Sequence, residues 1–330
     1  MRRAGKLLAA GLTLWLLILA FRQASLLTLL LPTVSLRYDT PLEKTQVEAA
    51  LAYGEKSGGP CFTFWAESST WVSAEERGSA ARQVIFRGEP EVAYPTAYCH
   101  GTAPVSPGAC AVSTGLAWAL WGGGNVVGLE LTVEEDIFRV TGVFEEDEPL
   151  LLRPGEGSFT AAELSGIPRG QDGYRFAASY GESCGLGTPE EVLWGPGFAG
   201  WAQALAWLPV ALAGGRLFRY GLRQARRLPG FRRSALRFGL AFLLALALPW
   251  LLEQLPAWLL PTKWSDFSFW SRLGQTLLNR CRDLLSLSPQ TRDVGVKLAM
   301  VKESLYVLAA CILSGALYRS TEITLPPHTS

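Results

Sequence analysis

The stretch from Leu236 to Leu252 is apolar on every side of a helix. It contains no Asp, Glu or Lys, and Arg237 near its start is its only charged residue. A helix on the surface of a soluble protein keeps a polar face toward water. A helix that crosses a membrane instead needs about 20 mainly apolar residues. The stretch therefore predicts a membrane-spanning helix.

Three further segments are almost uncharged and predict spans of the same kind. They are Leu7–Leu31, Phe198–Gly214 and Ser304–Tyr318, the last being short. Tryptophans near the start of the second segment, Trp194, Trp201 and Trp207, are typical of the membrane interface. A cleaved signal peptide is the alternative interpretation of the first segment, because a basic start followed by an apolar run is typical of both.

Positive charge is concentrated between the second and third segments. Residues 215–236 contain no Asp or Glu and hold seven of the eight arginines of this part of the chain: Arg216, Arg219, Arg223, Arg226, Arg227, Arg232, Arg233 and, just beyond, Arg237. Cytoplasmic loops carry an excess of Lys and Arg, so we expect this loop in the cytoplasm. Both termini then lie in the cytoplasm, and residues 35–195 lie outside it. The net charge of only +1 does not indicate nucleic-acid binding.

The predicted organisation has three parts. Residues 1–34 form a cytoplasmic tip and the first membrane helix, residues 35–195 an extracytoplasmic domain, and residues 196–330 the other three membrane helices. The last part includes an extracytoplasmic loop, 253–302. Within that loop, apolar and charged residues alternate at helical spacing between Phe269 and Leu285, which predicts an amphipathic helix on the outer membrane surface.

The extracytoplasmic domain reads as α+β. We expect a helix over 41–57 capped by Thr40, strands over Cys61–Trp65 and Val84–Arg87, and a short helix over Ser73–Arg82 with a capping box. The stretch 109–144 then predicts a strand, a helix capped by Ser113 or Thr114 and broken by Gly122-Gly123-Gly124, and two strands that meet at Glu134–Asp136.

Four cysteines lie in this domain: Cys61, Cys99, Cys110 and Cys184. An extracytoplasmic location permits disulfides, and four cysteines allow three pairings. Cys99 with Cys110, and Cys61 with Cys184, is the first pairing we expect. Four unpaired thiols are the alternative, which the sequence leaves equally open.

The sequence predicts no catalytic, cofactor or metal site. The domain has one histidine, His100, and no C-x-x-C pattern, and no spacing in it supports a Ser/His/Asp set. The glycine cluster at 122–124 follows a helix instead of opening one, which argues against a phosphate loop. The acidic run Glu145–Glu148 lacks the alternating ligands of a calcium loop and is typical of a solvated turn. We therefore expect a non-enzymatic protein.

The run GACAVSTGLAWALWGGGNVVGLELTVEEDIFRVTGVFEEDEPLLLRP resembles the periplasmic core domain of MacB-type and FtsX-type permeases of ABC transporters. The matching features are the aromatic-Gly pair Trp121-Gly122, the step Val127-Gly128 and the closing Val140–Val143. The earlier run CFTFWAESSTWVSAEERGSAARQVIFRGEPEVAYP resembles the same domain in proteins of Gram-positive bacteria. The order of one helix, a large domain and three helices is also similar.

The resemblance implies a MacB-like α+β domain inserted between the first and second of four transmembrane helices. It also implies a permease-like subunit that works with a separate cytoplasmic ABC ATPase and with an extracytoplasmic protein partner. The contact with the ATPase, or with lipid headgroups, falls on Arg219, Arg223, Arg226, Arg227, Arg232 and Arg233. This loop departs from the family because it lacks the acidic residues of a coupling helix. An orphan multi-pass protein, whose domain binds a partner or senses the envelope without transport, is the alternative.

Overall fold

The computed structural model describes residues 2–167, 172–261, 263, 265, 266, 268–286 and 290–322. The chain divides into two compact units. We call the first the helical unit; it comprises Met1–Thr28, Gly197–Cys281 and Asp293–Ser330. We call the second the α+β unit; it comprises Leu29–Pro196 and the short returning segment Arg282–Arg292. Residues 323–330, which the sequence analysis places in the cytoplasm, are outside the described part.

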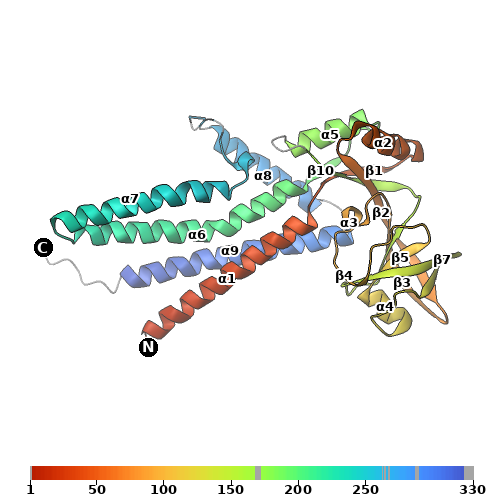
Figure 1. Cartoon of the computed structure of the whole chain (residues 1–330), viewed down its shortest axis with the longest axis horizontal. Coiled ribbons are helices and arrows are strands. Elements are labelled where there is room, and N and C mark those ends of the chain that lie inside the picture. The colour runs from red at the N-terminus through yellow and green to blue at the C-terminus, as the bar shows by residue number, and fades with distance from the viewer. Residues whose placement is uncertain are drawn as a thin grey trace. The chain divides into compact units, whose positions relative to one another are not determined.

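Long helices make up most of the helical unit. In chain order they are α1 Arg2–Leu30, α6 Gly195–Arg226, α7 Gly230–Glu253, α8 Ser268–Ser286 and α9 Thr291–Glu322. A short 3-10 helix, Ala257–Leu259, lies between α7 and α8. Helices α6 and α7 form an antiparallel hairpin (Figure 1). Trp207 of α6 packs edge-on against Phe21 of α1 and Trp250 of α7, with ring centroids 5.0 and 5.2 Å apart.

Two of the described helices are long and apolar enough to cross a membrane, Ala4–Leu30 and Gly230–Glu253. Only 6% of the apolar window of the first and 0% of the second is buried. Exposed apolar helices of this length need lipid around them, so the chain is a membrane protein. The expected segments 198–214 and 304–318 lie within α6 and α9, and their crossing of the membrane stays a prediction.

The expected loop 215–236 is mostly helical. Helix α6 continues to Arg226 and α7 begins at Gly230, so that only residues 227–229 connect them. Apolar residues between the arginines, such as Leu217 and Leu222, allow helical structure to continue past the apolar segment. The expected loop 253–302 likewise contains α8, which confirms the predicted amphipathic helix, and the first part of α9.

One mixed sheet organises the α+β unit. Its ten strands are β1 Val34–Leu42, β2 Cys61–Ala74, β3 Arg77–Arg87, β4 Tyr98–Gly101, β5 Ala109–Ser113, β6 Glu130–Val133, β7 Asp136–Phe144, β8 Leu150–Pro154, β9 Phe159–Ser165 and β10 Glu191–Trp194. The strand order is β10-β1-β9-β2-β3-β8-β5-β7-β4, and β6 pairs with β2 and β7. The α+β content predicted from the sequence is confirmed.

Four helices cover parts of this sheet: α2 Lys44–Ser57, α3 Pro90–Ala93, α4 Thr114–Trp121 and α5 Gly173–Ser183. Val47 of α2 and Ala177 of α5 enter one apolar core with Phe62, Phe64 and other residues of the sheet. A second core lies under α4, and a third, containing Trp65, lies near α3. Figure 1 shows α2 and α5 at one part of the sheet and α4 at another.

The predicted pattern of residues 109–144 is confirmed in its main elements. Ser113 caps α4, its hydroxyl accepting a hydrogen bond from the Leu116 amide at 3.1 Å. Gly122 ends the helix at φ 70°, a left-handed conformation that favours glycine. Strands β6 and β7 form the expected hairpin, with Val133 opposite Asp136.

Two other expectations are wrong in detail. The segment Ser73–Arg82 is not a helix but the end of the β2–β3 hairpin, in which Ala74 lies opposite Arg77. Val72, Ala74 and Ala81 are buried in the core under α4, and this packing overrides the local capping signal. Thr40 and Pro41 belong to β1, and α2 begins at Lys44 with a capping box between Glu43 and Gln46.

Candidate functional site around Glu163 and the start of helix α9

Glu163 is a fully buried carboxylate on an interior strand of the sheet. It lies on β9 between β1 and β2 and is 0% exposed. Its Oε2 accepts a hydrogen bond from the Thr33 hydroxyl at 2.6 Å, and its Oε1 accepts one from the Ser35 hydroxyl at 2.7 Å. The indole nitrogen of Trp65 also donates to Oε1, at 3.0 Å. A buried charge persists only where partners of this kind satisfy it.

The countercharge for Glu163 comes from a distant part of the sequence. Nη1 of Arg292 lies 2.8 Å from Glu163 Oε1, and both side chains are shielded from solvent, at 6% and 0% exposure. The same Arg292 nitrogen donates to the Ala93 carbonyl at 3.2 Å. Arg292 belongs to the returning segment of the α+β unit and is the second residue of α9. We call Thr33, Ser35, Trp65, Glu163 and Arg292 the glutamate cluster.

The surroundings of Glu163 favour its ionised form. Burial alone would raise the pKa of this carboxyl, since desolvation disfavours charge. The charges of Arg292 and Arg37 and the hydrogen bonds from Thr33 and Ser35 outweigh burial, and the pKa lies below its ordinary value. Glu163 is therefore a permanent negative charge at neutral pH.

Arg37 links the same cluster to the residue before α9. Its guanidinium lies 4.5 Å from the centroid of the Trp65 ring, and that of Arg292 lies 5.5 Å away, both within the range of cation–π attraction. Arg37 also donates a hydrogen bond to the side-chain oxygen of Gln290. Strand β1 is thus connected to Gln290 as well as to Glu163.

A second carboxylate, Glu67 of β2, holds the first residue of α9. Its Oε2 accepts the Thr291 amide at 2.9 Å, and its Oε1 accepts the Thr291 hydroxyl at 2.7 Å. Arg82 of β3 donates to Glu67 at 2.8 Å and to the Thr291 hydroxyl at 3.1 Å. A carboxylate at a helix N-terminus satisfies a free amide and interacts favourably with the helix dipole. We call Glu67, Arg82 and Thr291 the α9 cap.

The start of α6 is fixed close to the same place. The Gly195 amide donates to the Thr33 carbonyl at 3.2 Å, and Thr33 is also a hydrogen-bond donor to Glu163. A Cβ at position 195 would lie 2.4 Å from the Thr33 carbonyl oxygen, which is closer than real Cβ contacts allow. Glycine is therefore required here by the approach of two backbones.

These contacts place three helix ends at one part of the α+β unit. Thr33 follows the end of α1, Gly195 begins α6, and Thr291 and Arg292 begin α9; all four residues belong to this unit. Because the partners are strands of the central sheet, a displacement of the first turn of α9 must break buried ionic hydrogen bonds or displace β2 and β9. The arrangement fixes these three helix ends within the α+β unit.

The four cysteines of the domain are free thiols. Cys61 and Cys99 are exposed, whereas Cys110 and Cys184 are buried. The Cys99–Cys110 and Cys61–Cys184 bridges are not formed. Cys110 is packed in the apolar core under α4, where burial raises the pKa of its thiol to about 12. A neutral, unreactive thiol at this position fills space in the core.

The six arginines singled out from the sequence surround the α6–α7 connection. Arg219, Arg223 and Arg226 lie in the last two turns of α6, and Arg227 follows it. Arg232 and Arg233 lie in the first turn of α7, and all six side chains are exposed. We call this part, residues 215–236, the arginine hairpin. It belongs to the helical unit.

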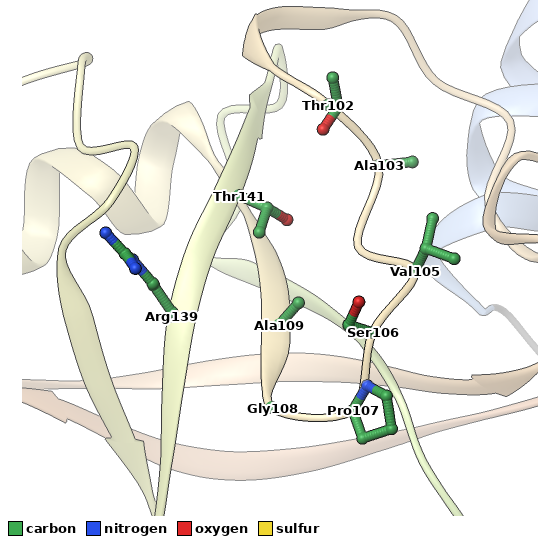
Figure 2. Close-up of a pocket in the computed structure, with 9 residues that line it drawn as sticks. All are labelled: Thr102, Ala103, Val105, Ser106, Pro107, Gly108, Ala109, Arg139 and Thr141. Carbon is green, nitrogen blue, oxygen red and sulfur yellow. The ribbon is translucent and has the colours of Figure 1, made fainter.

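A pocket of about 430 Å³ borders the loop after β4, and its polar side chains besides Arg139 are those of Thr102, Ser106 and Thr141 (Figure 2). Arg139 is the one charged residue among those that line it, and its guanidinium points away from Val105. Among the described residues no group of three His, Cys, Asp or Glu side chains is placed to hold a metal ion.

The residues of the glutamate cluster and the α9 cap were missed from the sequence. No motif or spacing in the sequence singles out Glu67 or Arg292. A weak signal was present, since Glu163 is an acid within the otherwise small and apolar run Phe159–Leu164. A charge in a buried strand indicates a partner, but the sequence does not say where that partner lies.

Comparisons with solved structures give similarities that cover about half of this chain. No protein-family model and no curated protein matches the sequence. The periplasmic region of MacB from Actinobacillus actinomycetemcomitans is similar with 13% identity and a TM-score of 0.42, covering 50% of this chain and 89% of that one. The extracellular domain of the ABC-type transporter YknZ from Gram-positive bacteria is similar with 12% identity and a TM-score of 0.36, covering 48% and 97%.

Proposed function

We propose that this protein is a non-catalytic, permease-like membrane subunit of an ABC-type system of the MacB/FtsX kind. In this proposal α1, α6, α7 and α9 all cross the membrane, and the α+β unit lies outside the cytoplasm. The arginine hairpin contacts a separate cytoplasmic ATPase. Nucleotide-driven movement of the helices is transmitted to the α+β unit, which acts on an extracytoplasmic protein partner.

The attachment of three helix ends to one buried cluster carries the proposal. A subunit that only needs an anchor requires one helix and a flexible connection. Here Thr33 and Arg292, next to α1 and within α9, both contact Glu163 of β9, and the Gly195 amide at the start of α6 donates to Thr33. The sequence resemblance of residues 109–144 to the MacB-type domain supports the same function.

The charge of the arginine hairpin supports a partner with negative charge. Arg223 and Arg226 at the end of α6 interact favourably with the helix dipole. Arg232 and Arg233 at the start of α7 do not, and the first turn of α7 has no acidic residue to offset them. The arginines at the start of α7 therefore do not serve the stability of that helix, and an acidic surface or anionic headgroups would offset them.

Co-purification tests the proposal. The full chain is isolated in mild detergent from its native membranes, and bound proteins are examined by ATP photo-crosslinking and mass spectrometry. We expect an ATP-binding subunit with the wild type, and its loss when Arg226, Arg227, Arg232 and Arg233 are changed to Gln. The matched control changes Arg272 and Arg282 of α8 to Gln and should keep the subunit.

Two results would contradict an ATPase-coupled function. One is that no ATP-binding protein accompanies the wild type under conditions that preserve membrane complexes. The other is that the hairpin variant retains the same ATP-binding protein. Either result, combined with loss of binding of the hairpin variant to anionic vesicles, would favour the orphan protein whose arginines bind lipid headgroups.

A further inference from the structure

Helix α8 has two chemically distinct halves. The apolar half contains most of its large side chains, at positions that fall on one side of a helix with 3.6 residues per turn: Phe269, Trp270, Leu273, Leu277, Leu278, Cys281, Leu284 and Leu285. The other half contains Ser268, Ser271, Arg272, Gln275, Thr276, Asn279, Arg282, Asp283 and Ser286. Arg280 is the one charged residue that lies within the apolar half.

Protein covers only part of the apolar half. Leu284 is buried, and Phe269, Leu273 and Leu277 are partly buried. The remaining edge is open, with Trp270 53%, Leu278 63% and Leu285 68% exposed. These three residues follow one another at spacings of eight and seven, about two helical turns each, so they recur along one side of the helix as a stripe. Such a stripe is costly in water at about 25 cal/mol for each Å² of apolar surface.

The place of α8 in the helical unit indicates what covers this stripe. Helix α7, which precedes it, has no buried residue along Gly230–Glu253 and must be surrounded by lipid. The connection that follows α7 packs at the start of α6, where Pro256 lies against Gly200. The chain therefore reaches α8 from the lipid-exposed end of α7, and Figure 1 shows α8 inclined to the long helices.

The start of α8 is held in a folded state by its own polar groups. Asp266 accepts the Ser268 amide at 3.1 Å and the Ser268 hydroxyl at 2.6 Å, and it pairs with Arg272 at 2.6 Å. These contacts cap the first turn of α8 on its polar half. The apolar stripe is therefore already formed on a folded helix. A preformed helix with exposed Trp and Leu opposite Arg and polar residues fits the boundary between headgroups and acyl chains.

We propose that α8 is an interfacial membrane helix whose stripe of Trp270, Leu278 and Leu285 lies in the acyl region of the bilayer surface. Its polar half faces headgroups and water. Because α9 begins at Thr291, shortly after α8, the α9 cap and Arg292 follow an element that is held at the membrane surface. This inference requires the membrane but not the ATPase partner of the proposed function.

Spin labelling of the full chain in lipid nanodiscs tests the proposal. Single cysteines at Leu278 and Leu285 are compared with single cysteines at Gln275 and Asn279, which are exposed on the polar half. The six native cysteines are changed to Ala or Ser. We expect higher accessibility to oxygen than to a nickel chelate at 278 and 285, and the reverse order at 275 and 279.

Two outcomes of the labelling experiment would overturn the proposal that α8 lies at the membrane surface. Equal accessibility of all four labels to the nickel chelate would place α8 in water. Exclusion of both reagents from 278 and 285 would mean that protein, such as a second copy of the chain, covers the stripe.

A second measurement keeps all native cysteines, in case their replacement prevents folding. Brominated lipids quench tryptophans that contact acyl chains. We expect the quenched fraction of the wild-type emission to fall in the Trp270→Phe variant. An unchanged quenched fraction would also contradict the proposal.

Discussion

At the scale of single residues, we expect substitution of Glu163 to affect the stability of the α+β unit most. The Glu163 carboxylate has no exposure to solvent. Its charge is tolerated in the sheet because Arg292 pairs with it and Thr33, Ser35 and Trp65 donate hydrogen bonds to it. Removing one member of a buried ion pair leaves the other as an uncompensated charge. The contribution of the glutamate cluster to the free energy of unfolding is therefore measured best in variants that lack one of its partners.

The first prediction concerns the Glu163–Arg292 pair. Glu163→Gln leaves Arg292 buried without its countercharge and should lower the free energy of unfolding by about 3–5 kcal/mol, measured by chemical denaturation in detergent. Glu163→Leu combined with Arg292→Met should cost less than Glu163→Gln alone. The control is Glu156→Gln, which removes the exposed Lys44–Glu156 pair and should leave stability unchanged within error. Equal effects of Glu163→Gln and Glu156→Gln would refute the assignment.

The second prediction concerns pH. The pKa of Glu163 is lowered in the folded state, whereas in the unfolded chain it is about 4.3. The unfolded state therefore binds the proton more readily, so the stabilisation is complete above about pH 4.3 and is lost as pH falls through the folded pKa. The stability difference between wild type and Glu163→Gln should narrow on acidification. A stability difference between the two proteins that stays constant as the pH falls below about 4.3 would contradict the lowered pKa of Glu163.

At the scale of elements, the sequence predicts helices and turns that depend on local residues better than elements that depend on tertiary packing. The helix after Ser113 was predictable because its N-cap and its glycine stop are both local. The β2–β3 hairpin was not, since Ser73 and Glu76 imitate a capping box while burial of Val72, Ala74 and Ala81 decides the structure. The cluster was beyond prediction because Thr33 and Glu163 are 130 positions apart.

The third prediction concerns the α9 cap. Glu67→Ala removes the acceptor of the Thr291 amide and should destabilise the start of α9 by about 1–2 kcal/mol. Hydrogen–deuterium exchange should become faster in the first turn of α9. Glu76→Ala, in the exposed turn of the β2–β3 hairpin, is the control and should not change exchange there. Unaltered protection in Glu67→Ala would show that the cap does not hold the helix.

The fourth prediction concerns the start of α6. Gly195→Ala places a methyl group against the Thr33 carbonyl and should lower stability by about 1–3 kcal/mol. Gly214→Ala in the same helix is the control, because a Cβ there meets nothing within 4 Å. Its helix propensity should make it neutral or slightly stabilising. Thermal unfolding of the two variants compares them, and a neutral Gly195→Ala would contradict the close approach.

At the scale of the whole molecule, α1, α6 and α9 each have one end fixed in the α+β unit. The α+β fold and the presence of membrane helices could be derived from the sequence, because apolar periodicity and turn residues are local features. The number of crossings and their orientation depend on charge distribution over the complete chain. The central claim is that the arginine hairpin and the α+β unit lie on opposite sides of one membrane.

Site-resolved labelling with a membrane-impermeant maleimide tests this claim, using right-side-out and inside-out vesicles that contain the Arg227→Cys variant. The exposed thiol of Cys99 serves as the internal marker for the α+β unit. We predict that Cys99 is labelled only in right-side-out vesicles and position 227 only in inside-out vesicles, as read by mass spectrometry. Labelling of both positions from the same side would contradict the account.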